Sequence, residues 1–217
     1  KGEMKVKKTE IVFILDKSGS MSGLEDDTIG GYNAMLNKQQ KEEGEAIVTT
    51  VLFDDKYEII HDRTNLKEIK PLTEKEYFVG GTTALLDALG ITINKIINAT
   101  KNTKKEHQAD KVMFVIITDG MENASREYSH EKIKAMIETQ KEKYNWEFIF
   151  LGANIDAVKT AASFGIDKDR AANYNADSVG TKLSYDVVSE VISDIRMERA
   201  VTSQWKEKIE DDYKTRR

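Results

Sequence analysis

The sequence predicts a doubly wound, Rossmann-like α/β fold, in which helices cover both faces of a mostly parallel sheet with one antiparallel edge strand. Two unbroken apolar runs, residues 11–15 and 112–117, are typical of strands that are buried on both faces of a parallel sheet. Strand-like and helix-like segments alternate along the chain, as they do in such folds. A pair of strands with a very short link, 46–53 and 57–61, predicts an antiparallel hairpin at the sheet edge.

The predicted elements follow one another in a regular order. Each helix is indicated by apolar residues at helical spacing, and each strand by a short apolar or β-branched run. Gly80 and Gly81 allow a sharp turn that brings Thr82 and Thr83 to the start of a helix, where hydroxyl groups cap free amides. The predicted ranges are strands over 9–15, 46–53, 57–61, 111–118, 146–151 and 171–174, and helices over 23–40, 84–99, 129–143, 156–164 and 184–200.

Chain length favours a single domain over residues 1–217, because 217 residues suffice for one substantial core. We expect that core to cover about 8–200. The remaining segment, 201–217, is charged, and it is expected to extend the last helix or to fray as a tail. Trp205 lies in this segment and is expected to pack back on the domain.

Composition narrows the classes of partner. The 33 basic and 38 acidic residues give a formal charge of −5 without a basic stripe, which argues against nucleic acid or an anionic membrane as partner. The chain has no cysteine, so disulfides and thiolate zinc sites are excluded. No apolar stretch approaches the roughly 18 residues that span a bilayer, and no signal-peptide pattern is visible. These features predict a cytoplasmic protein.

Five oxygen-bearing side chains are predicted to meet at one edge of the sheet. Asp16, Ser18 and Ser20 follow the first strand, Thr83 begins a helix, and Asp119 follows the strand over 111–118. Open α/β sheets keep their sites at the carboxyl ends of the strands. Two carboxylates and three hydroxyls suit a hard divalent cation, Mg²⁺ first, although Mn²⁺ and Ca²⁺ accept the same ligands. One position of an octahedral shell would remain for a ligand from outside.

This constellation resembles the von Willebrand factor type A (VWA) domain with its metal-ion-dependent adhesion site (MIDAS), over nearly the whole chain from about Lys8 to Ala200. The resemblance implies that Ser18, Ser20 and Thr83 bind the metal by their hydroxyls, and that Asp16 and Asp119 bind directly or through water. Thr83 fits the family's threonine better than Thr82. The stretches that carry the resemblance are Asp16-Lys17-Ser18-Gly19-Ser20-Met21, Gly81-Thr82-Thr83-Ala84-Leu85-Leu86-Asp87-Ala88-Leu89, Ile117-Thr118-Asp119-Gly120 and Phe150-Leu151-Gly152-Ala153-Asn154.

The resemblance also implies a function. In the family, an acidic side chain of a partner protein often completes the metal shell, and single intracellular domains of this kind often serve as subunits of larger assemblies. Two carboxylates only balance a divalent ion, so the ion would still attract a third carboxylate. We therefore expect a non-catalytic protein-binding module.

A metal-assisted hydrolase or phosphatase on a similar sheet is the alternative. Such chemistry usually needs a second carboxylate two residues after the first, where this chain has Ser18. No Gly-x-Ser-x-Gly elbow and no Gly-x-x-x-x-Gly-Lys phosphate loop occurs in the sequence.

Other polar residues are expected to have structural roles. Glu122 and Asn123 either form a rim that a partner contacts or belong to a solvated loop. The histidines show no metal-ligand spacing and are expected at the surface. Turn or cap roles are expected for Asp54, Asp55, Asp87 and Asp156.

Overall fold

A six-stranded sheet organises the computed structural model, which describes residues 7–216. The strand order is β3-β2-β1-β4-β5-β6, and only the β2–β3 pair is antiparallel. The predicted doubly wound α/β fold with one antiparallel edge strand is therefore confirmed. The strands are β1 (Lys8–Asp16), β2 (Glu45–Phe53), β3 (Tyr57–Asn65), β4 (Lys111–Thr118), β5 (Glu147–Gly152) and β6 (Ala171–Asn173).

The first strand, β1, lies inside the sheet, with β2 on one side and β4 on the other. After β1 the chain builds β2 and β3 on one side, and it then crosses to β4 on the other side. The junction between β1 and β4 is thus the point where the strand order reverses. Doubly wound folds bind ligands beside this point, at the carboxyl ends of the strands. Asp16 and Asp119 lie at this junction.

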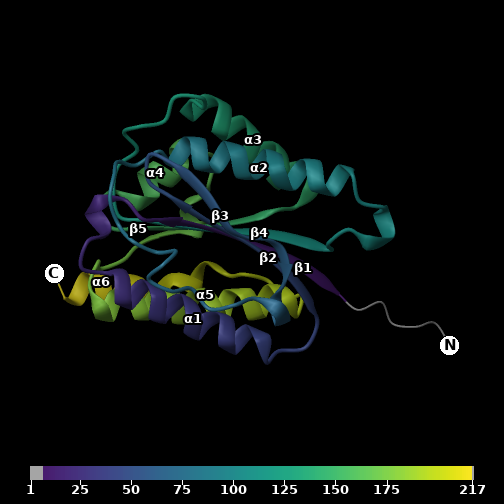
Figure 1. Ribbon diagram of the computed structural model, residues 1–217, viewed down its shortest axis with the longest axis horizontal. Coiled ribbons are helices and arrows are strands. Elements are labelled where there is room, and N and C mark those ends of the chain that lie inside the picture. The colour runs from purple at the N-terminus through teal and green to yellow at the C-terminus, as the bar shows by residue number, and fades with distance from the viewer. Residues whose placement is uncertain (1–6, 217) are drawn as a thin grey trace.

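Helices cover both faces of the sheet (Figure 1). One face carries α1 (Glu25–Gln40), α5 (Ser178–Arg196) and α6 (Glu207–Thr215). The opposite face carries α2 (Leu85–Lys101), α3 (His130–Tyr144) and α4 (Ala157–Ser163). Because both faces are covered, β1 and β4 bury the side chains on both sides, as their unbroken apolar runs predict.

Two separate hydrophobic cores result. Phe13 and Leu15 of β1 point into the core beneath α1 and α5, where Tyr32 packs edge-to-face against Phe13 at 5.5 Å between ring centroids. Val12 and Ile14 point into the other core, beneath α2 and α3. The sheet is thereby held from both sides, which fixes the positions of the strand ends that carry the candidate ligands.

The last long helix differs from its predicted range of 184–200. α5 begins at Ser178, where the Asp177 carboxylate caps it by accepting a 2.8 Å hydrogen bond from the Gly180 amide. The first turn packs so closely that a Cβ on Gly180 would lie 1.9 Å from the carbonyl oxygen of Asn175. Only glycine fits at position 180, and glycine favours helix weakly. The sequence therefore predicts a start at 184, which is too late. The helix ends at Arg196, followed by Glu198 in a left-handed conformation.

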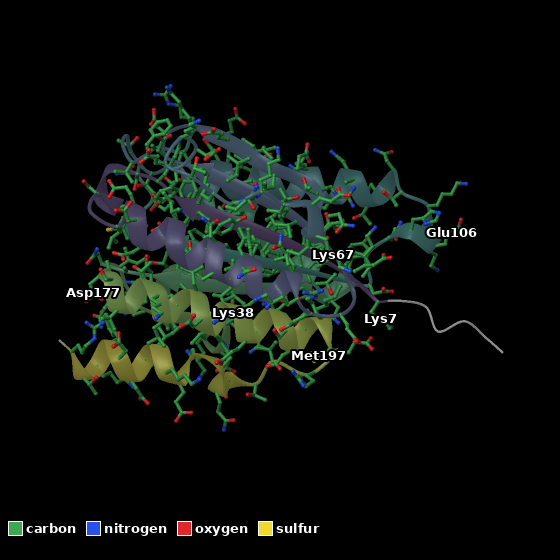
Figure 2. All side chains as sticks on the ribbon, turned by 60° about the horizontal axis from the view of Figure 1, so that its bottom comes forward. Lys7, Lys38, Lys67, Glu106, Asp177 and Met197 are labelled. Atoms are coloured by element: carbon green, nitrogen blue, oxygen red, sulfur yellow. The ribbon has the colours of Figure 1, made fainter. Side chains whose placement is uncertain are left out.

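The C-terminal segment neither extends α5 nor frays over residues 201–216. It turns back and forms α6, which lies alongside α5 (Figures 1 and 2). Ile209 of α6 is buried in the core, and the Trp205 indole donates a 2.6 Å hydrogen bond to the carbonyl of Asp169. The prediction that Trp205 packs back on the domain is confirmed. Within residues 7–216, no helix combines the length and the apolar character needed to cross a bilayer.

Candidate functional site

Asp16 anchors the loop that follows β1. Its Oδ1 accepts a 2.7 Å hydrogen bond from the Ser18 amide, which folds the loop back on the aspartate. Its Oδ2 accepts hydrogen bonds from the Thr118 hydroxyl at 2.7 Å and from the Asp119 amide at 3.3 Å. The side chain is almost completely buried. Asp16 therefore ties the end of β1 to the end of β4.

The hydroxyl groups predicted as ligands lie together beside this anchor. Ser18 Oγ lies 2.9 Å from Ser20 Oγ, and Ser20 Oγ donates a 2.5 Å hydrogen bond to Asp119 Oδ1. Thr83 joins the cluster at Gly120, where an added Cβ would lie 3.3 Å from Ser20 Oγ and 3.6 Å from Thr83 Oγ1. The structure thus brings side chains from three distant stretches to one place.

Asp119 carries the unsatisfied group of this cluster. Its Oδ2 is buried and has no hydrogen-bond partner among the described residues. Burial is the main cause that raises the pKa of Asp119 to about 6; the Ser20 hydrogen bond opposes the shift, and the negative charge of Asp16 adds to it. A buried carboxylate oxygen without a donor is costly, and a cation is the partner that would satisfy it. Ser20 is exposed, so the cluster is open to the surface.

The residues present fit a divalent cation bound largely by neutral oxygens. Within residues 7–216, no group of three or more His, Cys, Asp or Glu side chains is placed to hold a metal. Here the donors are two carboxylates, Asp16 and Asp119, and the hydroxyls of Ser18, Ser20 and Thr83. Such a set matches the oxygen preference of Mg²⁺, which also keeps several waters in its shell.

Several groups that the sequence did not single out support the site. The Tyr77 hydroxyl, buried beneath the loop, donates a 2.7 Å hydrogen bond to the carbonyl of Asp16. Lys17 is buried between the Glu58 carboxylate at 3.1 Å and the Phe78 ring at 4.6 Å. Tyr77 lies between β3 and α2, and its only sequence signal is an aromatic residue within a polar stretch.

The loop after Asp119 is also built by polar side chains. The Asn123 amide oxygen accepts a 2.9 Å hydrogen bond from the Thr83 amide. Glu122 accepts hydrogen bonds from the amides of Leu86, Ala124 and Ser125, so it is a structural group of the loop and of the start of α2. Asp87 accepts hydrogen bonds from three amides over residues 126–128, so it also has a structural role in this loop.

Exposed apolar side chains flank the cluster. Phe78 precedes the Gly80–Gly81 turn and is 58% exposed, and Met121 follows Asp119-Gly120 and is 74% exposed. Both side chains are therefore accessible to a molecule that approaches the cluster.

The histidines lie away from the cluster. His107 and His130 are exposed, as predicted, but His61 is half-buried in β3. Its Nδ1 lies 2.9 Å from Thr50 Oγ1 and 3.1 Å from the Tyr32 hydroxyl. Burial lowers the pKa of His61, with smaller opposing effects from the Lys70 backbone and the Glu76 charge. The prediction of a surface position is wrong for this residue.

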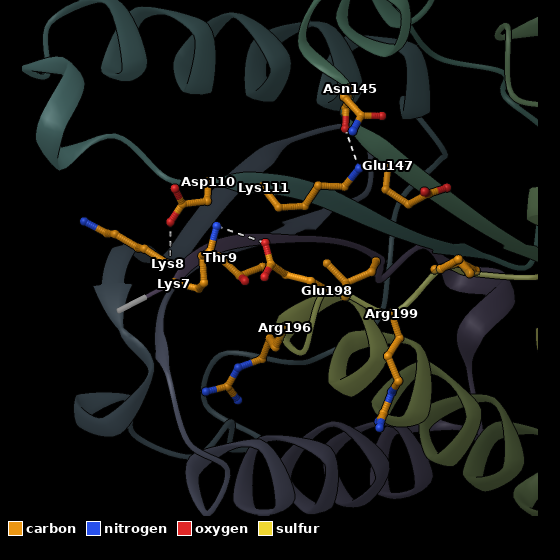
Figure 3. Close-up of a pocket in the computed structure, with 13 residues that line it drawn as sticks. Lys7, Lys8, Thr9, Asp110, Lys111, Asn145, Glu147, Arg196, Glu198 and Arg199 are labelled. Atoms are coloured by element: carbon orange, nitrogen blue, oxygen red, sulfur yellow. Dashed lines mark hydrogen bonds and ion pairs between the residues drawn. The ribbon is translucent and has the colours of Figure 1, made fainter. Parts of the chain in front are cut away.

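A cavity of about 340 Å³ lies at the opposite edge of the sheet, where β1, β4 and β5 begin (Figure 3). Several of its charged side chains are engaged in ion pairs or in hydrogen bonds to the backbone. Lys7 pairs with Glu198 at 3.0 Å, and Lys111 donates a 2.6 Å hydrogen bond to the carbonyl of Asn145. These contacts make the cavity a structural feature at the pole away from Asp16 and Asp119.

Comparison with known proteins supports the fold. The chain matches no protein-family model and no curated protein. Solved structures do match, and three of them are described here. One is proximal thread matrix protein 1 from the mussel byssus, with zinc in its MIDAS motif, at a TM-score of 0.58 and 14% identity over 86% of this chain and 46% of that chain.

The second structure is a von Willebrand factor type A protein from Catenulispora acidiphila, with a TM-score of 0.57 and 14% identity over 85% of this chain and 42% of that one. The third is the PilB minor pilin from Streptococcus sanguinis, with a TM-score of 0.61 and 12% identity over 88% of this chain and 63% of that one. The chain spans less than two thirds of each of these proteins. At such low identity the likeness concerns the fold, which is similar to that of VWA domains.

Proposed function

We propose that the chain is a protein-binding module that holds a divalent cation at Asp16, Ser18, Ser20, Thr83 and Asp119, and that it captures a carboxylate of a partner protein. The preferred cation is Mg²⁺, and Mn²⁺ or Ca²⁺ suits the same oxygen ligands. The observation that carries the proposal is the buried Oδ2 of Asp119, which has no hydrogen-bond partner among the described residues and lies beside three hydroxyl groups, of which that of Ser20 belongs to an exposed residue.

Charge balance explains why a partner carboxylate would bind. Asp16 and Asp119 together neutralise a divalent ion, and the serine and threonine hydroxyls add no charge. The bound ion would supply electrostatic attraction for an anionic ligand at the surface. The chain's own groups would position it: Asp16 holds the loop through Ser18 and Thr118, and Tyr77 holds the Asp16 backbone from beneath.

The comparisons support a binding role in a larger assembly. The structural neighbours include a thread matrix protein, whose MIDAS motif holds zinc, and a minor pilin. We propose binding rather than catalysis because Ser18 occupies the position at which a metal-assisted hydrolase usually needs a second carboxylate.

Metal titration and peptide selection test the proposal together. Mn²⁺ is titrated calorimetrically into wild type, Asp119→Asn and Asp26→Asn, the last being a matched change of an exposed carboxylate on α1. We expect one bound ion in wild type and Asp26→Asn, and affinity at least about tenfold weaker in Asp119→Asn, since it loses the charged ligand. Random peptides displayed on phage are then selected on immobilised wild type in Mg²⁺ and eluted with EDTA.

The selected peptides are expected to share an Asp or Glu, and Asp119→Asn is expected to retain none of them. Equal Mn²⁺ binding by wild type and Asp119→Asn would contradict the metal site. Peptides that stay bound in EDTA would contradict metal-dependent capture.

A further inference from the structure

A groove of about 690 Å³ adjoins the cluster of candidate metal ligands. Its walls are the turn between β2 and β3, the residues that lead into α2, and the loop that follows β4. The site described above does not use this groove. The lining side chains that matter here are Asp55, Thr82, Asp87, Asn123, Arg126 and Glu127.

The groove and the cluster share their walls. Thr82 lines the groove, and the next residue, Thr83, belongs to the cluster. Asn123 also lines the groove, and two hydrogen bonds join it to Thr83. The Asn123 side-chain oxygen accepts one from the Thr83 backbone amide at 2.9 Å, and the Asn123 backbone amide donates the other to the Thr83 carbonyl at 3.0 Å. The groove and the cluster are therefore adjacent.

Asp55 completes the connection from the other side. Gly81 has a φ of +75°, and a Cβ at this position would lie 2.3 Å from Asp55 Oδ1. The Gly81 carbonyl in turn accepts a 3.1 Å hydrogen bond from the amide of Gly19, in the loop after β1. Glycine at 81 thus lets the Asp55 carboxylate lie against the turn that holds the loop after β1.

The groove is negatively charged. Three carboxylates line it, Asp55, Asp87 and Glu127, against the single guanidinium of Arg126. Asp87 is engaged by the backbone amides of residues 126–128. Asp55 and Glu127 are exposed, and within residues 7–216 neither carboxylate has an ion-pair partner. Two carboxylates are therefore free to receive a cationic group.

We propose that the partner presents two charges together: an Asp or Glu for the bound cation, and a Lys or Arg within about three residues that lies in this groove. The inference rests on the proposed function, since the metal sets the place of the carboxylate. An extended chain rises about 3.3 Å per residue, so neighbouring side chains of one segment reach both the cluster and the adjoining groove. The bound cation is positive and the groove beside it is negative. This pair of charges favours a partner segment with the reverse pattern over a uniformly acidic one.

The test repeats the phage selection in Mg²⁺ with two further proteins. Asp55→Asn/Glu127→Gln removes the free groove charges, and Asp26→Asn removes a carboxylate outside the groove. In wild type and Asp26→Asn, Lys or Arg is expected to be enriched within three positions of the shared Asp or Glu, and the double variant is expected to lose this enrichment. Exposed ion pairs are weak, so a selected peptide should bind the double variant about three- to tenfold less tightly.

A double-mutant cycle assigns the contact. The basic residue of the selected peptide is replaced by norleucine, and the affinity loss is expected in wild type but not again in the double variant. EDTA-sensitive Asp or Glu peptides without a basic neighbour would overturn the groove inference and leave the proposed function intact. An equal loss of enrichment in Asp26→Asn would also overturn it. Failure to select any EDTA-sensitive carboxylate peptide would overturn both proposals.

Discussion

The charge of Asp119 has opposite effects on stability with and without a bound cation, and the variant Asp119→Asn separates them. In the metal-free protein the carboxylate is buried, its Oδ2 has no partner among the described residues, and its pKa is raised from 3.8 to about 6. A raised pKa means that the unfolded chain loses this proton at lower pH than the folded chain does. The stability of the metal-free protein therefore falls as pH rises from about 4 to 6, and the full cost remains at pH 7.5.

The size of this cost follows from the shift. Each pKa unit corresponds to about 1.4 kcal/mol, so a shift of about two units sets an upper limit near 3 kcal/mol. An asparagine carries no charge at this position and keeps an oxygen for the Ser20 hydroxyl. After the cost of burying the amide, we expect metal-free Asp119→Asn to be about 1–2 kcal/mol more stable than wild type at pH 7.5.

Magnesium should reverse the order of stability. At a concentration 100 times its dissociation constant, a ligand that binds only the folded state stabilises it by about 2.7 kcal/mol. For a domain of this size that corresponds to a rise in Tm of roughly 5–10 °C. Wild type is expected to show this rise, and Asp119→Asn, whose affinity is at least about tenfold weaker, is expected to show at most about half of it.

Thermal and urea unfolding at pH 7.5, in EDTA and in saturating Mg²⁺, measure both effects. Glu142→Gln, on the exposed side of α3, removes a charge far from the site and should behave as wild type does. Equal gains in Tm from Mg²⁺ for Asp119→Asn and wild type would contradict the role of Asp119 as a metal ligand. A metal-free Asp119→Asn that is less stable than metal-free wild type would contradict the cost of the buried charge.

Four further outcomes are expected. Tyr77→Phe removes the hydrogen bond to the Asp16 carbonyl and should cost about 1–2 kcal/mol in urea unfolding, with weaker Mn²⁺ binding in calorimetry. Ile116→Ala leaves a cavity in a fully buried strand and should cost about 2–5 kcal/mol in the same unfolding assay. Because burial lowers the pKa of His61, stability should fall as pH drops from 6.5 through the lowered value, and urea midpoints of His61→Gln should lack this part of the pH dependence. Met121→Ser should leave unfolding unchanged but weaken a phage-selected peptide about fivefold by fluorescence anisotropy, because it removes exposed apolar surface.

The central strands could be predicted because their burial leaves a simple pattern. Helices cover both faces of the sheet, so Val12 and Ile14 are as fully buried as Phe13 and Leu15 on the other side. An unbroken apolar run is the direct result. β3 has the opposite property: it lies at the sheet edge with half-exposed side chains, and it continues to Asn65 through residues that show no clear strand pattern.

The start of α5 shows where local sequence is insufficient. Gly180 and Thr181 favour helix weakly, yet they stand in its first turn because Asn175 approaches the backbone too closely for a larger side chain at 180. That requirement comes from a tertiary contact, which outweighs propensity. The segment 201–216 is similar, since α6 depends on burying Ile209 and on the hydrogen bond of Trp205 to Asp169.

In the candidate site, residues that directly follow a strand could be predicted from the sequence. Residues whose position depends on which loops meet could not. Asp16 and Asp119 end adjacent strands at the reversal of strand order, so their proximity follows from topology, which the sequence pattern predicts. Tyr77 supports the same loop from a distant segment, and no local pattern indicates it. Asp55 and Glu127 belong to this second class. Each alone is an ordinary solvated carboxylate, and only the junction of the β2–β3 turn with the loop after β4 places both in one groove beside the candidate ligands. The partner preference that we infer is therefore a property of the assembled loops, and changes at 55 and 127 should alter that preference while the binding of metal is retained.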